Sequence, residues 1–81
     1  MKFFVYLLLC ADDTLYCGYT TDVARRVAVH NAGKGAKYTR SRLPVVCVYH
    51  EEFATRNEAL AREAAIKKYS RAQKLALLQK S

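Results

Sequence analysis

The chain has 81 residues, 14 Lys and Arg against seven Asp and Glu, and a net charge of +7. That length has room for one domain, residues 1–81, with a single modest core, and a hydrophobic share of 52% excludes wholesale disorder. The positive charge favours an anionic partner, with nucleic acid ahead of a lipid surface. A soluble protein with a merely basic surface has the same composition, so charge alone leaves both interpretations open.

The basic residues are concentrated in one part of the chain. No Asp or Glu occurs between Val23 and His50. That segment contains six basic residues: Arg25, Arg26, Lys34, Lys37, Arg40 and Arg42. A positive field segregated in this way suits a phosphate backbone.

Two features bear on the compartment. The apolar run over residues 3–11 resembles a short signal peptide, but Leu9 is large where cleavage requires a small residue, and the run is too short to cross a bilayer. Cys10, Cys17 and Cys47 include no CxxC pair, so we expect buried, reduced thiols rather than a zinc or redox site. We therefore expect a cytoplasmic protein with no membrane partner.

The first two predicted strands, Phe3–Cys10 and Thr14–Thr20, form a hairpin. The first strand is apolar on both alternating faces, which is typical of a central strand covered on both sides. Asp12-Asp13 is a poor two-residue hairpin turn, because both positions need φ > 0 and neither is glycine. We therefore expect a three-residue loop over residues 11–13.

The length of this loop decides which face each tyrosine occupies. With a three-residue loop, Cys10 pairs with Thr14. Tyr6 then faces Gly18, and Tyr6 and Tyr16 project from the same side of the hairpin. A two-residue loop would place the two tyrosines on opposite sides.

A helix is predicted next, over Asp22–Asn31, with Thr21 as its N-cap and Gly33 ending it. Arg26 and His30 are four residues apart and share a face of this helix.

Residues 33–42 then form a basic loop that lacks the spacing of a phosphate-binding P-loop. Basic side chains around one tyrosine are compatible with contacts to a nucleic-acid backbone. The candidates are Lys34, Lys37, Tyr38, Arg40 and Arg42. An ordinary solvated loop explains the same residues.

The rest of the chain predicts a third strand, Val45–Glu51, and two further helices capped by Thr55 and Ser70. The first of these helices has an apolar arc formed by Ala59, Leu60, Ile66 and, less centrally, Ala64. Glu63 falls between Leu60 and Ile66 in this arc, where a carboxylate is costly unless it is paired or binds a cation. Its i+4 neighbour Lys67 is one partner and a metal ion is the other; the sequence leaves both open.

The fold predicted by these elements is an α+β domain. Its order is β-β-α-β-α-α, with a three-stranded antiparallel sheet flanked by helices.

These positions together resemble the GIY-YIG nuclease domain family. Phe-Val-Tyr at 4–6 stands where the family has GIY, and Tyr-Cys-Gly at 16–18 stands where it has YIG. Arg26 matches the family's arginine, His30 falls where members carry Tyr or His, and Glu63 matches its metal-binding glutamate. The resemblance covers nearly the whole chain and is strongest to the small, stand-alone bacterial members. It implies hydrolysis of DNA phosphodiester bonds with one divalent metal ion, Mg²⁺ or Mn²⁺.

The resemblance also implies a role for each catalytic candidate. Tyr16 would accept a proton from the attacking water if nearby positive charge lowered its pKa, and Tyr6 and His30 would orient Tyr16 or relay its proton. Arg26 would stabilise the charge that develops in the transition state. Glu63 would hold the metal, with water and phosphate as the other ligands.

The DNA partner would be bound weakly by a lone domain, mostly through phosphates. Gly18, which has no Cβ, would let a phosphate approach the strand closely. A separate targeting domain, present in larger family members, is missing from the chain, and the sequence leaves open whether a protein partner delivers it to its target. Two rival interpretations stay open: a nucleic-acid-binding module that does not cut, and a basic face that meets an acidic protein.

Overall fold

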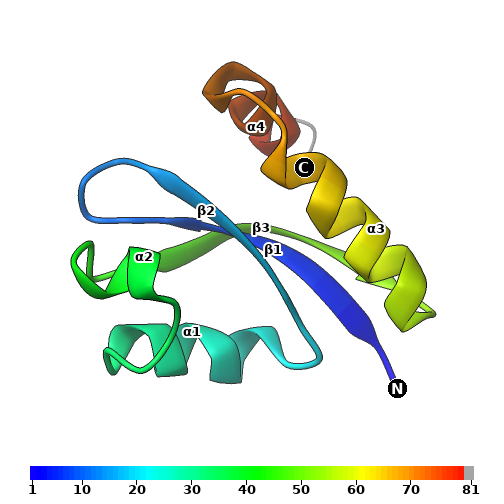
Figure 1. Cartoon of the computed structure of the whole chain (residues 1–81), viewed down its shortest axis with the longest axis horizontal. Coiled ribbons are helices and arrows are strands. Elements are labelled where there is room, and N and C mark those ends of the chain that lie inside the picture. Colours follow the sequence, from blue (N-terminus) through cyan, green and yellow to red (C-terminus); the bar gives the residue numbers. More distant parts are fainter. Residues whose placement is uncertain (80–81) are drawn as a thin grey trace.

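A three-stranded antiparallel sheet separates two pairs of helices in the computed structural model, which describes residues 1–79 (Figure 1). The elements in chain order are β1 (Phe3–Leu9), β2 (Leu15–Thr20), α1 (Val23–Asn31), α2 (Lys37–Arg40), β3 (Val46–Phe53), α3 (Arg56–Lys67) and α4 (Arg71–Leu78). The predicted α+β fold is confirmed, and the structure adds the single-turn helix α2. The sheet order is β2-β1-β3, so β2 and β3 are its edges.

The β1–β2 hairpin has the predicted register. The N–H of Cys10 donates to the carbonyl of Thr14 at 2.9 Å, and Tyr6 pairs with Gly18. The three-residue loop closes because Asp13 adopts a φ of +68°, a conformation that Asp tolerates better than most residues. Tyr6 and Tyr16 therefore lie on the same face of the sheet, as the loop length predicts.

Each face of the sheet is covered by one helix pair. Val5 and Leu7 of β1 pack with Ala59 and Ile66 of α3 on one face. Tyr6, Leu8 and Cys10 pack with Val45 and with Val27 of α1 on the other. Figure 1 shows the result, with α1 and α2 below the sheet and α3 and α4 above it. The expectation of a central first strand covered on both sides is confirmed.

The predicted N-cap of α1 was wrong by one residue. Asp22 is the N-cap, and its carboxylate accepts the backbone N–H of Arg25 at 3.1 Å. Thr21 is exposed, and the hydroxyl of Thr20 accepts the N–H of Asp22 instead. An Asp carboxylate caps a helix as well as a Thr hydroxyl does, so N-cap preference alone could not decide between the neighbours Thr21 and Asp22. Gly33 does end the helix, with a φ of +77°.

The segment predicted as a basic loop, residues 33–42, folds into α2 and a tight return. Arg42 holds it in place by donating to the Tyr38 carbonyl at 2.7 Å and to the carboxylate of Asp12 at 2.8 Å. Thr39 is fully buried. The segment is therefore packed against the hairpin loop and α1 rather than free in solvent.

The C-terminal helices begin where predicted. The Thr55 hydroxyl accepts the N–H of Glu58 at 3.2 Å, and Ser70 forms a full capping box with Gln73. Ala64, expected at the margin of the apolar arc of α3, is exposed. Within residues 1–79 the structure contains no helix that is both long and apolar enough to span a membrane.

Candidate active site

Tyr6 lies at the centre of the site. It comes from the central strand, pairs with Gly18 and is 1% exposed. A Cβ added to Gly18 would overlap the Tyr6 hydroxyl and the ring carbon that carries it. Glycine at this position therefore lets the tyrosine ring lie over β2. The phosphate contact expected of Gly18 stays a prediction.

A buried chain of hydrogen bonds runs from Tyr6 through His30 to Thr39. The Tyr6 hydroxyl lies 3.1 Å from Nε2 of His30, and Nδ1 of the same ring lies 2.8 Å from Oγ1 of Thr39. Thr39 in turn donates to the carbonyl of Ala36 at 2.9 Å. His30 and Thr39 are both 0% exposed, so water does not compete for these bonds.

The single hydrogen of the Thr39 hydroxyl fixes the direction of the other bonds. That hydrogen goes to Ala36, so Thr39 accepts from His30, and Nδ1 carries a hydrogen. In the neutral ring Nε2 is then an acceptor only, and the Tyr6 hydroxyl donates to it. The lone pairs of the Tyr6 oxygen are left for another donor.

The protonation states are consistent with this direction. Burial, and then the positive charge of Arg26, lower the pKa of His30 below its usual 6.5. The ring is therefore neutral at pH 7. Burial raises the pKa of Tyr6 above 10, an effect that Arg26 opposes and that the charges of Tyr16 and Glu63 reinforce. Tyr6 is a neutral hydroxyl in the resting protein.

Tyr16 belongs to a stack of rings beside this chain. Its ring lies edge-on to His30 at 5.5 Å between centroids and stacks on Tyr38 at 5.7 Å. The Arg42 guanidinium also lies over the Tyr38 ring, 3.9 Å from its centroid. Tyr38 nevertheless remains 39% exposed, so part of this side chain is open to solvent.

Arg26 is the cation of the site. Its charge acts on both Tyr6 and His30. Its Nε is buried and has no hydrogen-bond partner among residues 1–79. Arg26 lines a hollow of about 280 Å³ at the start of α1, with Thr20, Thr21, Asp22, Arg25 and Val29. A buried donor without a partner is costly, so an anionic oxygen that filled this place would be favoured.

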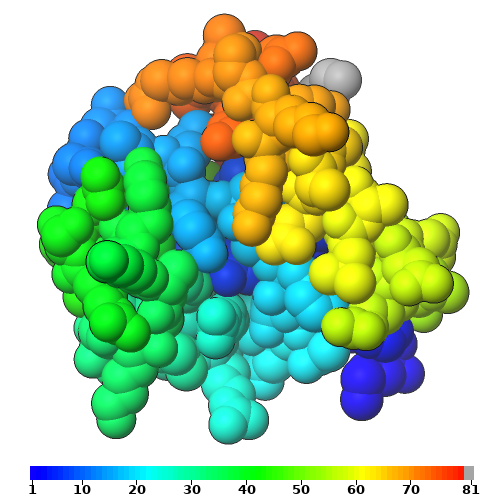
Figure 2. Space-filling model, viewed as in Figure 1, coloured from blue at the N-terminus to red at the C-terminus, as the bar shows by residue number. Residues whose placement is uncertain are grey.

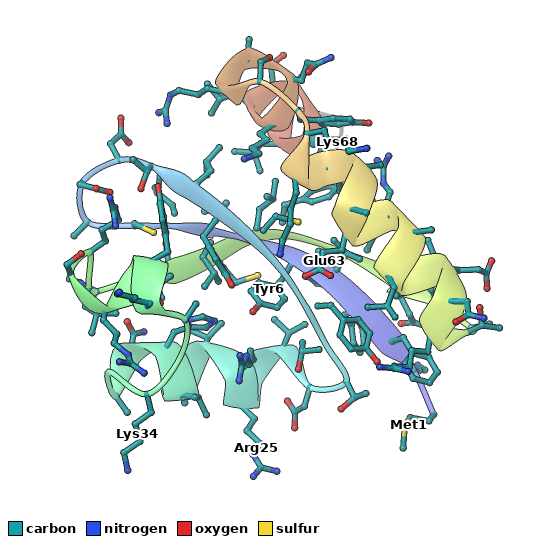
Figure 3. All side chains as sticks on the ribbon, viewed as in Figure 1. Met1, Tyr6, Arg25, Lys34, Glu63 and Lys68 are labelled. Carbon is teal, nitrogen blue, oxygen red and sulfur yellow. The ribbon has the colours of Figure 1, made fainter. Side chains whose placement is uncertain are left out.

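Glu63 reaches the site from the helix on the opposite face of the sheet. The Cys17 thiol of β2 lies 4.0 Å from the Glu63 carbonyl, which places this turn of α3 beside the edge strand. Figure 3 shows the Glu63 carboxylate directed toward Tyr6. Its charge adds to the burial that raises the pKa of Tyr6, and also to the burial that raises the pKa of Cys17 to about 11.

Glu63 is also the candidate metal ligand. Its carboxylate lies 3.5 Å from Nζ of Lys67, and its side chain is 19% exposed, so it attracts a cation and solvent reaches it. No group of three or more His, Cys, Asp or Glu side chains within residues 1–79 is placed to hold a metal ion. One carboxylate fits Mg²⁺, which keeps several waters and takes substrate phosphate oxygens as ligands. It does not fit a tightly held structural ion such as zinc.

The other predicted nucleic-acid contacts are separated by the fold. Arg42 is engaged within the protein, as described above. Lys34, Lys37 and Arg40 are exposed, and among residues 1–79 none has an ion pair within 4.0 Å. Figure 3 shows Lys34 pointing away from the sheet on the far side of α1. These three stay predictions.

Sequence reasoning missed two residues behind His30. Thr39 fixes the imidazole, and Gly35 makes room for it, since a Cβ at Gly35 would overlap Nδ1 of His30. Glycine and threonine are ordinary residues of a loop, so nothing in the sequence singled these two out.

Comparison with known proteins places the chain among small domains of one family. Residues 2–76 match the GIY-YIG catalytic domain. A UPF0213 protein of Staphylococcus haemolyticus is 55% identical over 78 residues, which are 96% of this chain and 95% of that protein. A UPF0213 protein of Halobacterium salinarum is 60% identical over 73 residues, 90% of this chain and 95% of that one. The solution NMR structure of a UPF0213 protein from Bacillus halodurans is 46% identical, with a TM-score of 0.63 over 98% of this chain and 84% of that one.

Proposed function

The chain belongs to the GIY-YIG catalytic domain family, among its small UPF0213 members, and from this premise we propose that it is a metal-dependent endonuclease that hydrolyses phosphodiester bonds in DNA. The observation that carries the proposal is the convergence on Tyr6 of three groups from two helices on opposite faces of the sheet. His30 is hydrogen-bonded to Tyr6, and Arg26 and Glu63 both act on its pKa.

The attacking water must lose a proton as its oxygen bonds to phosphorus. Tyr6 can take that proton while it passes its own hydrogen to Nε2 of His30, along the bond that the two already share. Because burial lowers the pKa of His30, the ring starts the reaction neutral and able to accept. The resemblance assigns the first acceptance to Tyr16. By the route through Tyr6 the proton ends on His30.

Charge then shifts to the phosphoryl oxygens and to the leaving 3′ oxygen. Arg26, whose Nε has no hydrogen-bond partner among residues 1–79, would donate to a non-bridging oxygen, because a forked guanidinium suits a phosphate. Glu63 would hold Mg²⁺ or Mn²⁺, and such an ion, when bound, supplies the positive charge that stabilises the leaving oxygen.

A plasmid-nicking assay in Mg²⁺ or Mn²⁺ tests the proposal. We expect Glu63→Ala to lose activity by about 100-fold or more. Glu52→Ala, which removes a carboxylate that is 52% exposed on β3, is the matched control and should cut like wild type. Equal nicking by wild type and Glu63→Ala would point to a contaminating nuclease and refute the assignment.

A nucleic-acid-binding module that does not cut is the second candidate, favoured by the net charge of +7 and the exposed side chains of Lys34, Lys37 and Arg40. It predicts salt-dependent DNA binding that survives Glu63→Ala, with no cleavage of branched, nicked or single-stranded DNA. With either activity, a domain this small would bind weakly, and we propose that a protein partner delivers it to its target.

A further inference from the structure

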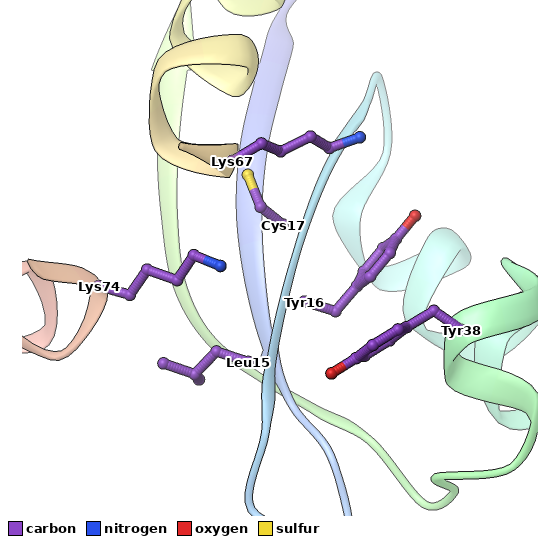
Figure 4. A pocket seen from close by; sticks show the side chains of 6 residues that line it. All are labelled: Leu15, Tyr16, Cys17, Tyr38, Lys67 and Lys74. Atoms are coloured by element: carbon purple, nitrogen blue, oxygen red, sulfur yellow. The ribbon is translucent and has the colours of Figure 1, made fainter. Parts of the chain in front are cut away.

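A hollow of about 330 Å³ lies along β2, next to the candidate active site. It is lined by Leu15, Tyr16, Cys17, Tyr38, Lys67 and Lys74. Figure 4 shows the ammonium groups of Lys67 and Lys74 directed toward β2 and the two tyrosine rings on the other side of that strand. Figure 2 shows this face of the molecule hollowed between the green segment that contains α2 and the yellow-to-orange helix α3.

A second hollow of about 210 Å³ continues the first. It is lined by Thr14, Leu15, Arg71 and Lys74, and it shares Leu15 and Lys74 with its neighbour. We call the two together the β2 groove. Arg71 is fixed in the second part by Asp13, whose carbonyl it reaches at 2.6 Å and whose carboxylate it reaches at 3.2 Å.

The groove is positively charged. Three cations line it, Lys67, Lys74 and Arg71, and no carboxylate is among the lining residues of either part. Lys67 and Arg71 each have a carboxylate partner next to the groove, Glu63 at 3.5 Å and Asp13 at 3.2 Å, so Lys74 supplies the uncompensated charge. Lys74 is half-buried and has no ion pair within 4.0 Å among residues 1–79. An ammonium group held against a strand without a counter-ion favours an anionic ligand.

The backbone of β2 adds hydrogen-bond donors. Cys10 and Thr14 form the bonded pair that closes the hairpin, so alternation assigns the β1-facing bonds of β2 to residues 16, 18 and 20. The N–H groups of Leu15 and Cys17 then face the free edge of the sheet, along the groove. Edge N–H groups between two ammonium groups are suitable donors to phosphate oxygens.

The aromatic wall is engaged by the protein itself. Tyr16 stacks on Tyr38 at 5.7 Å between centroids, and Arg42 lies 3.9 Å from the centroid of the same ring, which limits the room for a base to stack there. The ligand that matches the cations and the backbone N–H donors of the groove is a sugar–phosphate backbone.

We infer that the β2 groove binds the backbone of one nucleic-acid strand, at the phosphates that follow the one held at Arg26. This rests on the proposed function, because Lys67 pairs with Glu63 and so joins the groove to the candidate active site. The strand runs along the edge of β2 from Glu63 toward Arg71. Its contacts are with phosphates, so binding does not depend on base sequence.

Binding of a labelled, short oligothymidylate in EDTA tests the inference, because metal-dependent cleavage does not occur there. The variants are Lys74→Met and Lys68→Met, which each remove one positive charge. Lys68 is exposed at the end of α3 and lines neither part of the groove. We expect Lys74→Met to make the slope of log affinity against log salt shallower by about 0.7, the value for one lost contact to a single strand, and Lys68→Met to leave it unchanged. Thermal unfolding checks that both variants fold.

Equal weakening by the two variants, with equal slopes, would overturn the inference and assign binding to the general positive field. If the wild-type protein nicks DNA and Lys74→Met has the wild-type slope, the groove is not the binding site and the proposal of a nuclease stands. If the wild-type protein does not nick DNA and Lys74→Met shows the expected change of slope, the proposal of a nuclease is refuted and the groove stands as a binding site.

Discussion

Nδ1 of His30 lies 2.8 Å from Oγ1 of Thr39, and this bond selects the ring tautomer that faces Tyr6. Thr39 has its own hydrogen committed to Ala36, so it can only accept from the imidazole. The Tyr6 hydroxyl is therefore a donor, and His30 is the group that can receive its proton. In the proposed reaction Thr39 is a positioning residue, because it acts only through His30.

Replacing Thr39 by valine should disturb this arrangement without changing the shape of the core. We expect Thr39→Val to destabilise the protein by about 1–3 kcal/mol, because a buried Nδ1–H loses its acceptor. Nicking should fall by about tenfold or more, as expected for the loss of an oriented proton acceptor. The ¹⁵N chemical shifts of the His30 ring should show loss of the Nδ1–H tautomer.

Thr39→Ser keeps the hydroxyl and is the control. It should retain the wild-type tautomer and most of the activity. Identical ring shifts in the valine and serine variants would contradict the role assigned to Thr39.

Acidification should weaken the protein through His30. Burial, and then Arg26, lower its pKa in the folded state, so below pH 6.5 the unfolded chain binds more protons at this residue than the native chain does. Its contribution to stability is present above pH 6.5 and is lost as the pH falls toward the lowered folded value. Denaturant unfolding at several pH values measures the slope, and His30→Phe should remove this part of it.

The same titration should shape the pH–rate profile of nicking. In the proposed mechanism His30 must be neutral to accept a proton, so activity should decline on the acid side as the pH falls toward the pKa of His30 in the folded protein, which lies below 6.5. The residual activity of Tyr6→Phe should lack this acid limb, because the hydrogen bond to His30 is gone. If Tyr6→Phe keeps the limb and Tyr16→Phe loses it, the proton reaches His30 by way of Tyr16 instead.

A methyl group at position 18 should be poorly tolerated. In Gly18→Ala the new Cβ overlaps the end of the Tyr6 ring, and overpacking of this kind costs about 1–3 kcal/mol. Nicking should be lost as the hydroxyl is displaced from His30. The double variant Tyr6→Leu/Gly18→Ala removes the overlap, so its free energy of unfolding should fall by less than the sum of the single changes. Additive effects would mean that the two positions do not compete for space.

Arg62 is expected to stabilise the face of the sheet that α3 and α4 cover. It binds the Glu51 carboxylate through two bonds, at 2.9 and 3.0 Å, and donates to the Tyr69 hydroxyl at 3.1 Å. Arg62→Met should cost about 2 kcal/mol, as for partly buried charge-assisted bonds. Arg56→Met, which removes an exposed arginine from the same helix, should cost much less. DNA nicking at permissive temperature should be unchanged in both.

Much of the site could be predicted because its parts obey local rules. The parity of the hairpin follows from one loop length, so the shared face of Tyr6 and Tyr16 could be deduced from Asp12-Asp13 alone. Helix periodicity put Arg26 and His30 on one face, and the caps at Thr55 and Ser70 need only four consecutive residues. The cap of α1 was misplaced because Thr21 and Asp22 are adjacent and equally suitable.

The sequence by itself determined which strands pair, which residues share a face and which side chains are candidates for catalysis. Only the tertiary structure decided how they meet. Glu63 belongs to a helix on the far face and reaches Tyr6 beside the edge strand, and α2 folds back so that Thr39 and Gly35 enclose His30. Periodicity orients a side chain relative to its own strand or helix, whereas contacts between distant segments depend on how those elements pack. The position of Lys74 beside β2, opposite the tyrosines, is of the second kind.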